Sequence, residues 1–124
     1  MGKIVGLGGP FIKSKDPKVL AAWYQDILGL QFNGNTYVDL PFTKEDGQPS
    51  AGSNVLSFFK EGNDYFKPST KDVMLNFRVE GFRDLIATLK EKGVEMVGEP
   101  MEEAYGKFAW IMDPEGNKIE LWEP

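Results

Sequence analysis

The 124-residue sequence contains neither cysteine nor histidine. Without cysteine the chain can form no disulfide, no thiolate nucleophile and no cysteine-ligated metal centre. Without histidine it also lacks the commonest metal ligand and the commonest general base at neutral pH. A serine or threonine nucleophile would need a lysine or a carboxylate as its base, so the sequence indicates no catalytic residue.

Long apolar runs and excess basic charge are also missing. The chain has no apolar stretch long enough to span a membrane and no charged-then-apolar leader, so we expect no membrane span, no signal peptide and, by default, a cytoplasmic location. The net charge of −5 and pI near 4.8 argue against a nucleic-acid partner, which requires a basic face. Cationic or neutral small molecules suit this charge better. The length predicts one domain over residues 1–124.

The most informative stretch present is the terminal segment Asp113–Trp122, with the sequence DPEGNKIELW. Asp-Pro followed by Gly-Asn predicts a tight turn between two strands. In the second strand Ile119 and Leu121 point to one face and Glu120 points to the other, because side chains alternate along a strand. Glu120 is therefore a carboxylate opposite a buried face. Either that face is solvated, or the carboxylate belongs to a site.

Two apolar stripes at helical spacing predict two helices. The first runs from about Pro17 to Leu28, with Asp16 as its N-cap and Gly29 as its stop. The second begins at Phe82 and ends at Gly93.

Strands are expected around both helices, in the same order in each half of the chain. The eight predicted strands are Lys3–Lys13, Leu30–Phe32, Thr36–Leu40, Asn54–Lys60, Asp72–Glu80, Val94–Val97, Tyr105–Met112 and the segment from Asn117 onward. A polar loop is predicted over Pro41–Ser53, another loop over Gly98–Glu103, and a connector over Glu61–Lys71. Tyr65 and Phe66 of this connector are exposed unless something, such as a partner subunit, covers them. Each half then reads as a βαβββ module, at about 1–62 and 70–124, which predicts an α+β fold.

Two runs resemble a known family. DPEGNKIEL is similar to the closing hairpin of the glyoxalase / bleomycin-resistance / extradiol-dioxygenase (vicinal oxygen chelate) superfamily, and DPKVLAAWYQDILGLQF resembles its first helix and the strand entry after it. The resemblance implies two repeated βαβββ modules forming a cup-shaped eight-stranded mixed sheet with helices outside. It also implies a homodimer, either with the cup built within one chain or with modules exchanged between subunits.

The resemblance implies one metal-ligating residue in this chain. In metal-dependent members the Glu of the final strand binds the metal, and Glu120 is the matching residue. The other three metal positions fall at Gly9, Ser57 and Met74, which suit a divalent cation poorly. Tight sites need three or more protein ligands. We therefore expect no cofactor, with a weakly bound divalent metal at Glu120 left open.

Aligning the halves assigns the two faces of the sheet. Pro10–Lys13 matches Leu75–Arg78, and Val55–Phe58 matches Lys118–Leu121, so Ile12, Phe77, Leu56, Ile119, Phe58 and Leu121 should all face the helices. The opposite face would line the cup. Its candidate ligand-binding residues are Phe11, Phe59, Asn76, Arg78, Phe108, Trp110, Glu120 and Trp122. Lys13, Val55 and either Tyr37 or Asp39 would lie near them.

Aromatic walls with a few polar groups are typical of a small-molecule pocket, although these rings could instead simply fill the centre of a small barrel. Arg78 and Glu120 could form an ion pair or recognise the two ends of a polar ligand.

Three functions follow. The first is a protein that binds a small organic molecule in the aromatic cup, as the resemblance to bleomycin-resistance proteins implies, without a tightly bound metal. The second is a divalent-metal-dependent lyase or dioxygenase with an atypical site, which rests on fold analogy and Glu120. The third is a non-catalytic dimeric interaction module. The sequence does not decide the ligand, nor whether any reaction is catalysed.

Overall fold

Both helices form where the sequence predicts them. α1 spans Pro17–Leu28, and the Asp16 side chain accepts a hydrogen bond from the Val19 amide at 3.2 Å. Gly29 ends α1 in the left-handed conformation, at φ 75°, which glycine adopts without the steric cost of a side chain. α2 spans Phe82–Glu91 and ends just before Gly93. Neither helix is long and apolar enough to cross a membrane.

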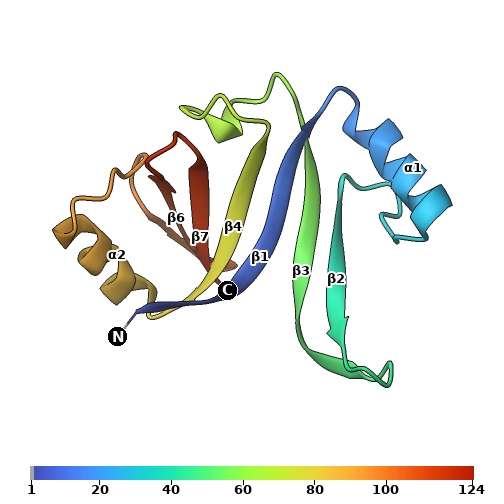
Figure 1. Cartoon of the computed structure of the whole chain (residues 1–124), viewed down its shortest axis with the longest axis horizontal. Coiled ribbons are helices and arrows are strands. Elements are labelled where there is room, and N and C mark those ends of the chain that lie inside the picture. The colour runs from blue at the N-terminus through green and yellow to red at the C-terminus, as the bar shows by residue number, and fades with distance from the viewer. Residues whose placement is uncertain (1) are drawn as a thin grey trace.

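The structure is a computed structural model that describes residues 2–124. Its strands form one mixed sheet in the order β2-β3-β1-β4-β7-β6-β5, with α1 and α2 on either side of the view (Figure 1). The strands are β1 Lys3–Ser14, β2 Tyr37–Thr43, β3 Pro49–Lys60, β4 Val73–Glu80, β5 Met101–Glu103, β6 Gly106–Met112 and β7 Lys118–Glu123. The two parallel pairs, β1 with β3 and β4 with β7, flank the antiparallel contact between β1 and β4 at the centre.

The strand register agrees with the predicted faces. Phe11 pairs with Ser57 between β1 and β3, and Asn76 pairs with Glu120 between β4 and β7. These are the positions that the alignment of the two halves made equivalent. We call the sheet face that carries Phe11, Asn76 and Glu120 the cup face.

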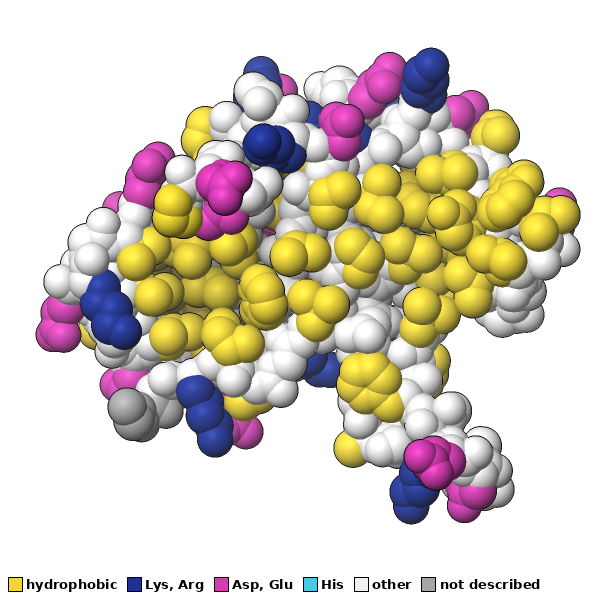
Figure 2. All heavy atoms as spheres, in the orientation of Figure 1, with side chains coloured by type: hydrophobic (Ala, Val, Ile, Leu, Met, Phe, Trp, Pro, Cys, Tyr) yellow, Lys and Arg dark blue, Asp and Glu magenta, His cyan; other side chains and the backbone are white. Residues whose placement is uncertain are grey.

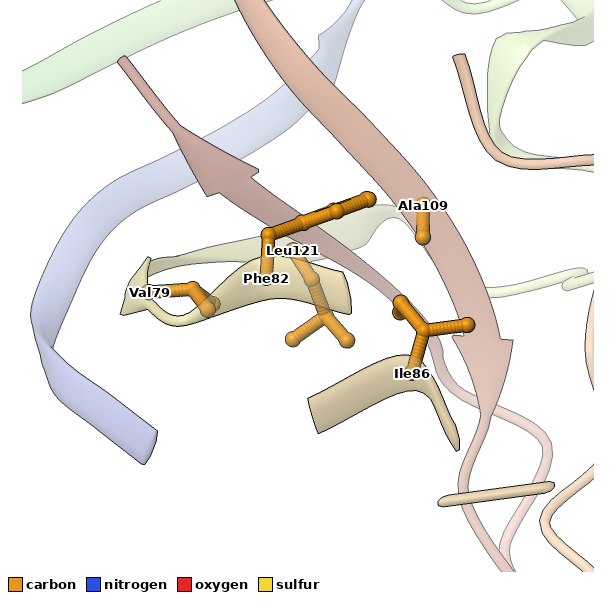
Figure 3. Packing of buried hydrophobic residues seen from close by; sticks show 5 residues of the cluster. All are labelled: Val79, Phe82, Ile86, Ala109 and Leu121. Carbon is orange, nitrogen blue, oxygen red and sulfur yellow. The ribbon is translucent and has the colours of Figure 1, made fainter. Parts of the chain in front are cut away.

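The opposite face packs against the helices in two apolar clusters. Phe82 and Ile86 of α2 pack on Val79, Ala109 and Leu121 (Figure 3). Under α1, the buried residues are Ala21, Phe32, Val38 and Phe58. Because these clusters take the apolar side chains of β3, β4, β6 and β7, the alternate side chains of the same strands are left for the cup face.

Residues 2–124 form seven strands, so the prediction of eight was wrong. Leu30–Phe32 is no strand because its backbone bonds locally: the Leu30 amide donates to Tyr24 O at 3.5 Å and the Phe32 amide donates to Leu30 O at 3.1 Å. Val94–Val97 makes only an isolated bridge, between Met96 and Ile111. The first half is thus strand, helix and two strands, whereas the second is strand, helix and three strands.

Two predicted loops contain strand. β2 and β3 extend through most of Pro41–Ser53 and meet in a turn at 44–48, forming a hairpin that projects from the sheet (Figure 1). Proline signals misled the prediction here, because β2 is an edge strand and a missing N–H on its outer side costs no ladder hydrogen bond. β5 lies inside the predicted loop Gly98–Glu103.

The two aromatic side chains of the connector are covered by this chain itself. Asp64–Phe66 forms a short 3₁₀ helix, η1, whose Asn63 side chain accepts from the Tyr65 amide at 2.7 Å. Phe66 is fully buried and Tyr65 is partly buried. η1 folds onto the cup face, where it covers part of the predicted site.

Candidate functional site

Glu120 lies in the middle of β7 on the cup face, and only 3% of its surface is exposed. Its carboxylate accepts three hydrogen bonds: from Asn76 Nδ2 at 2.8 Å, from Trp110 Nε1 at 2.9 Å and from the Tyr65 hydroxyl. Asn76 and Trp110 are its register neighbours on β4 and β6, whereas Tyr65 arrives from η1. Three neutral donors therefore hold one buried negative charge.

Lys118 stands two residues before Glu120, on the same face of β7, and is 7% exposed. Its ammonium donates to the Tyr65 carbonyl oxygen at 2.6 Å and lies 5.3 Å and 5.8 Å from the ring centroids of Tyr65 and Trp110. Burial lowers the pKa of Lys118, and the Glu120 charge opposes that shift. The cation and the carboxylate thus partly balance each other beneath Tyr65.

Tyr65 is held at both ends by these two residues. Burial is the largest cause of a raised pKa at its phenol, and the negative charge of Glu120 adds to it. The phenol therefore remains a proton donor to Glu120 throughout the neutral range.

Aromatic rings continue outward from this polar centre in both directions. Phe59 stacks on Tyr65 at 5.5 Å and contacts Phe11 at 5.3 Å between centroids. On the other side Phe108 stacks between Trp110 at 6.5 Å and Trp122 at 6.4 Å. These ring pairs give the cup face two rigid aromatic walls.

A pocket of about 170 Å³ lies between the walls. It is lined by Phe11, Val55, Asn76, Phe108, Glu120 and Trp122. Glycines of β1 shape its floor: a Cβ at Gly8 would lie 1.8 Å from Asn76 Oδ1, and one at Gly9 would lie 1.7 Å from the Val55 carbonyl oxygen. The missing side chains therefore let Asn76 and β3 approach β1 closely.

The structure brings the eight predicted site residues together on one face. Five of them line the pocket, namely Phe11, Asn76, Phe108, Glu120 and Trp122. Phe59 and Trp110 extend the walls. Arg78 does not bond Glu120; its guanidinium carbon lies 5.1 Å from the Trp122 ring centroid and its Nη1 donates to Ser53 O at 3.3 Å. Whether these residues bind a ligand remains a prediction.

Sequence reasoning missed Tyr65 and Lys118 as members of this group. Strand alternation was a usable signal for Lys118, which shares a face with Glu120. No signal pointed to Tyr65, because the path of an irregular connector is not readable from its residues.

Comparison with known proteins agrees with this architecture. The family model described as Glyoxalase/Bleomycin resistance protein/Dioxygenase superfamily matches residues 10–121. The chain belongs to this superfamily. No curated protein sequence matched the chain.

Several solved structures are similar to this one in fold over nearly the whole length of the chain. A methylmalonyl-CoA epimerase variant from Streptomyces coelicolor is 15% identical, with 98% of each chain covered and a TM-score of 0.67. The epimerase from Mycobacterium tuberculosis is 22% identical over 98% of this chain and 89% of that one, with a TM-score of 0.61. A glyoxalase/bleomycin resistance protein/dioxygenase superfamily member from Vibrio splendidus is 15% identical over all of both chains, with a TM-score of 0.60. These likenesses support the fold.

The donor set fits the metal of metal-dependent superfamily members poorly. Glu120 already accepts three hydrogen bonds, and its neighbour Asn76 turns its amide nitrogen, not its oxygen, toward the carboxylate. Across residues 2–124, no three His, Cys, Asp or Glu side chains come together as a metal-holding group. A divalent ion at Glu120 would have to break this network and would still lack protein ligands.

Proposed function

We propose that this superfamily member binds a small organic molecule in the aromatic pocket, without a tightly bound metal. The observation that carries the proposal is the pocket itself: an apolar hollow between two aromatic walls, with Asn76 and Glu120 at its base. Few convergent polar groups within an aromatic lining are what a small-molecule site needs.

Glu120 serves such a pocket as a fixed element. Its three hydrogen bonds tie together β4, β6, β7 and η1, so the walls are preorganised before a ligand enters. Preorganisation reduces the conformational entropy lost on binding. The alternative, a metal-dependent lyase or dioxygenase, would need the carboxylate free for a metal.

A panel of flat aromatic compounds tests the proposal, with binding followed by tryptophan fluorescence and by changes in NMR chemical shifts. Val55→Phe should fill the pocket and abolish binding, because Val55 faces the cup. Val73→Phe is the matched control, since Val73 is an exposed valine on the opposite face of the central sheet. Equal binding by both variants, or no binding by the unmodified protein, would overturn the proposal.

We also propose that two copies associate through the face that carries the helices. Figure 2 shows hydrophobic side chains spread across this face from α2 to α1. Its large apolar residues with 39% to 65% exposure are Ile4, Leu7, Val19, Trp23, Ile27, Leu28, Val73 and Leu75. Apolar side chains exposed together on one face in this way are typical of a protein–protein contact surface.

Sedimentation at micromolar concentration tests the dimer. The unmodified protein should sediment at twice the chain mass, and Trp23→Glu should sediment as a monomer, because it places a charge in the apolar face. Tyr105→Glu is the control: Tyr105 is exposed and contacts Phe108 of the cup side, so this variant should remain dimeric. A monomeric unmodified protein would contradict the proposal and would also count against the third function, a dimeric interaction module.

A further inference from the structure

We infer that the ligand is a flat aromatic carboxylate, with its ring in the aromatic pocket and its carboxylate on Arg78. This inference rests on the proposed function and adds the chemical class of the ligand. It is carried by the position of Arg78 at the end of one pocket wall and by the lack of an anion to balance its charge.

Arg78 is attached to the pocket through Trp122. The two are register partners on β4 and β7, and the guanidinium carbon lies 5.1 Å from the centroid of the indole ring that lines the pocket. The face of the indole ring attracts the guanidinium charge and so favours this position of the cation. A substituent on a ring seated against Trp122 would therefore lie close to the Arg78 guanidinium.

The charge of Arg78 is not compensated by the described part of the protein. Among residues 2–124, its one recorded hydrogen bond goes to the carbonyl oxygen of Ser53, at a long 3.3 Å, and no ion pair includes it. A guanidinium has five N–H donors, so most of its donors stay free for a ligand. The half-buried position makes an added anion more strongly attracted than one at a fully exposed arginine.

The pocket carboxylate does not oppose an anionic ligand as strongly as its formal charge suggests. Glu120 is covered by Tyr65, Asn76 and Trp110, which all donate to it, and Lys118 lies beside it. The net charge of −5 predicts cationic or neutral ligands. The charge near the pocket differs from the net charge of the chain. Arg78 beside the pocket wall has no carboxylate partner in the described part of the chain, whereas the buried Glu120 carboxylate is surrounded by hydrogen-bond donors and by Lys118.

Arg78 also lines an open groove of about 480 Å³. Its lining includes Phe42, Leu7 and Asn54 as well as Arg78. Arg78 thus faces a larger opening while its neighbour Trp122 lines the aromatic pocket, so the polar end of a ligand bound to Arg78 can remain near water. One guanidinium balances one negative charge and matches the planar geometry of a carboxylate, so a monoanionic carboxylate fits better than a dianionic phosphate.

Three ligands with one ring system separate the possibilities: 2-naphthoate, 2-naphthamide and 2-naphthylmethylammonium, titrated by calorimetry. We expect naphthoate to bind at least about tenfold tighter than naphthamide, as for a charge-assisted hydrogen bond, and the ammonium compound to bind weakest. Arg78→Met should reduce naphthoate to the affinity of naphthamide and leave naphthamide unchanged. Arg78→Lys should keep part of the preference, because it retains the charge but loses the planar pairing.

Arg83→Met is the control, because Arg83 is exposed and paired with Glu102 at 2.9 Å; it should change neither affinity. Equal affinities of naphthoate and naphthamide for the unmodified protein, or a preference for the ammonium compound, would overturn the inference while the proposed function stands. Loss of naphthamide binding in both Arg78 variants would show a structural role for Arg78 and would also overturn it. If none of the three binds, the inference fails, and the broader aromatic panel decides the proposed function separately.

Discussion

Tyr65 and Glu120 are 55 positions apart in the sequence, yet the phenol of Tyr65 donates a hydrogen bond to the Glu120 carboxylate. The same tyrosine accepts the Lys118 ammonium at its carbonyl oxygen, at 2.6 Å. One residue of the connector thereby covers a buried charge pair of β7. This contact closes one end of the cup face, and its energetics can be tested directly.

Removing the Glu120 charge should destabilise the protein. In Glu120→Gln, an amide N–H replaces one carboxylate oxygen and faces groups that are themselves hydrogen-bond donors. Lys118 also loses its neighbouring negative charge. We expect the free energy of unfolding, measured by urea denaturation, to fall by about 2–4 kcal/mol. Glu102→Gln removes an exposed pair with Arg83 and should cost less than about 1 kcal/mol. Equal costs for the two variants would mean that the buried network does not stabilise the fold.

The Tyr65 phenol should make stability fall at high pH. Its pKa is raised in the folded protein, first by burial and then by Glu120, so above the ordinary tyrosine pKa of about 10 the folded state binds a proton that the unfolded state has lost. The stabilising contribution is therefore complete below pH ~10 and decreases as pH rises further.

The comparison with Tyr65→Phe isolates this contribution. Lys118, whose pKa is lowered by burial, acts in the opposite direction in both proteins and cancels in the difference. We expect the stability difference between the unmodified protein and Tyr65→Phe to stay constant below pH ~10 and to shrink as the pH rises above the ordinary tyrosine pKa of about 10. A Tyr65→Phe difference that stays flat or grows with pH would contradict the assignment.

The glycines of β1 should differ sharply in their tolerance of a side chain. Gly9 has φ +147° and its added Cβ would lie 1.7 Å from the Val55 carbonyl oxygen, whereas a Cβ at Gly6 would meet nothing within 4 Å. Gly9→Ala should therefore lower the free energy of unfolding by about 3 kcal/mol or more, and Gly6→Ala should change it by less than about 1 kcal/mol. Thermal and urea unfolding of the pair provide the measurement, and similar values would show that β1 and β3 do not pack as closely as described.

Divalent metals should not bind tightly. Calorimetric titration of Ni²⁺, Zn²⁺ and Mn²⁺ into chelator-stripped protein should give no dissociation constant below roughly 10 µM, equivalent to about 7 kcal/mol, because Glu120 is engaged by three donors. Tighter binding that disappears in Glu120→Gln would make the metal-dependent enzyme the better explanation of the fold. The Glu102→Gln protein provides the matched control for nonspecific carboxylate binding.

Strand alternation and capping predicted most of what positions the candidate site. Asp16 and Gly29 fixed α1 because caps act through neighbouring backbone groups, and alternation put Asn76 and Glu120 on one face. The extents of β2 and β3 were mispredicted, since an edge strand tolerates proline and its length depends on its partner. The strand expected at Leu30–Phe32 was absent because local turn hydrogen bonds used its backbone donors.

The sequence by itself determined which chemistry is missing and which face carries the carboxylate, because composition and a period of two are local properties. It left no histidine or cysteine to join Glu120. Only the tertiary structure decided the surroundings of Glu120 and Arg78. Tyr65, Asn76 and Trp110 donate hydrogen bonds to Glu120. Arg78 lies against the Trp122 ring and has no acidic partner among the described residues. Those partners come from separate strands and from a connector, and their approach depends on packing that no local pattern specifies.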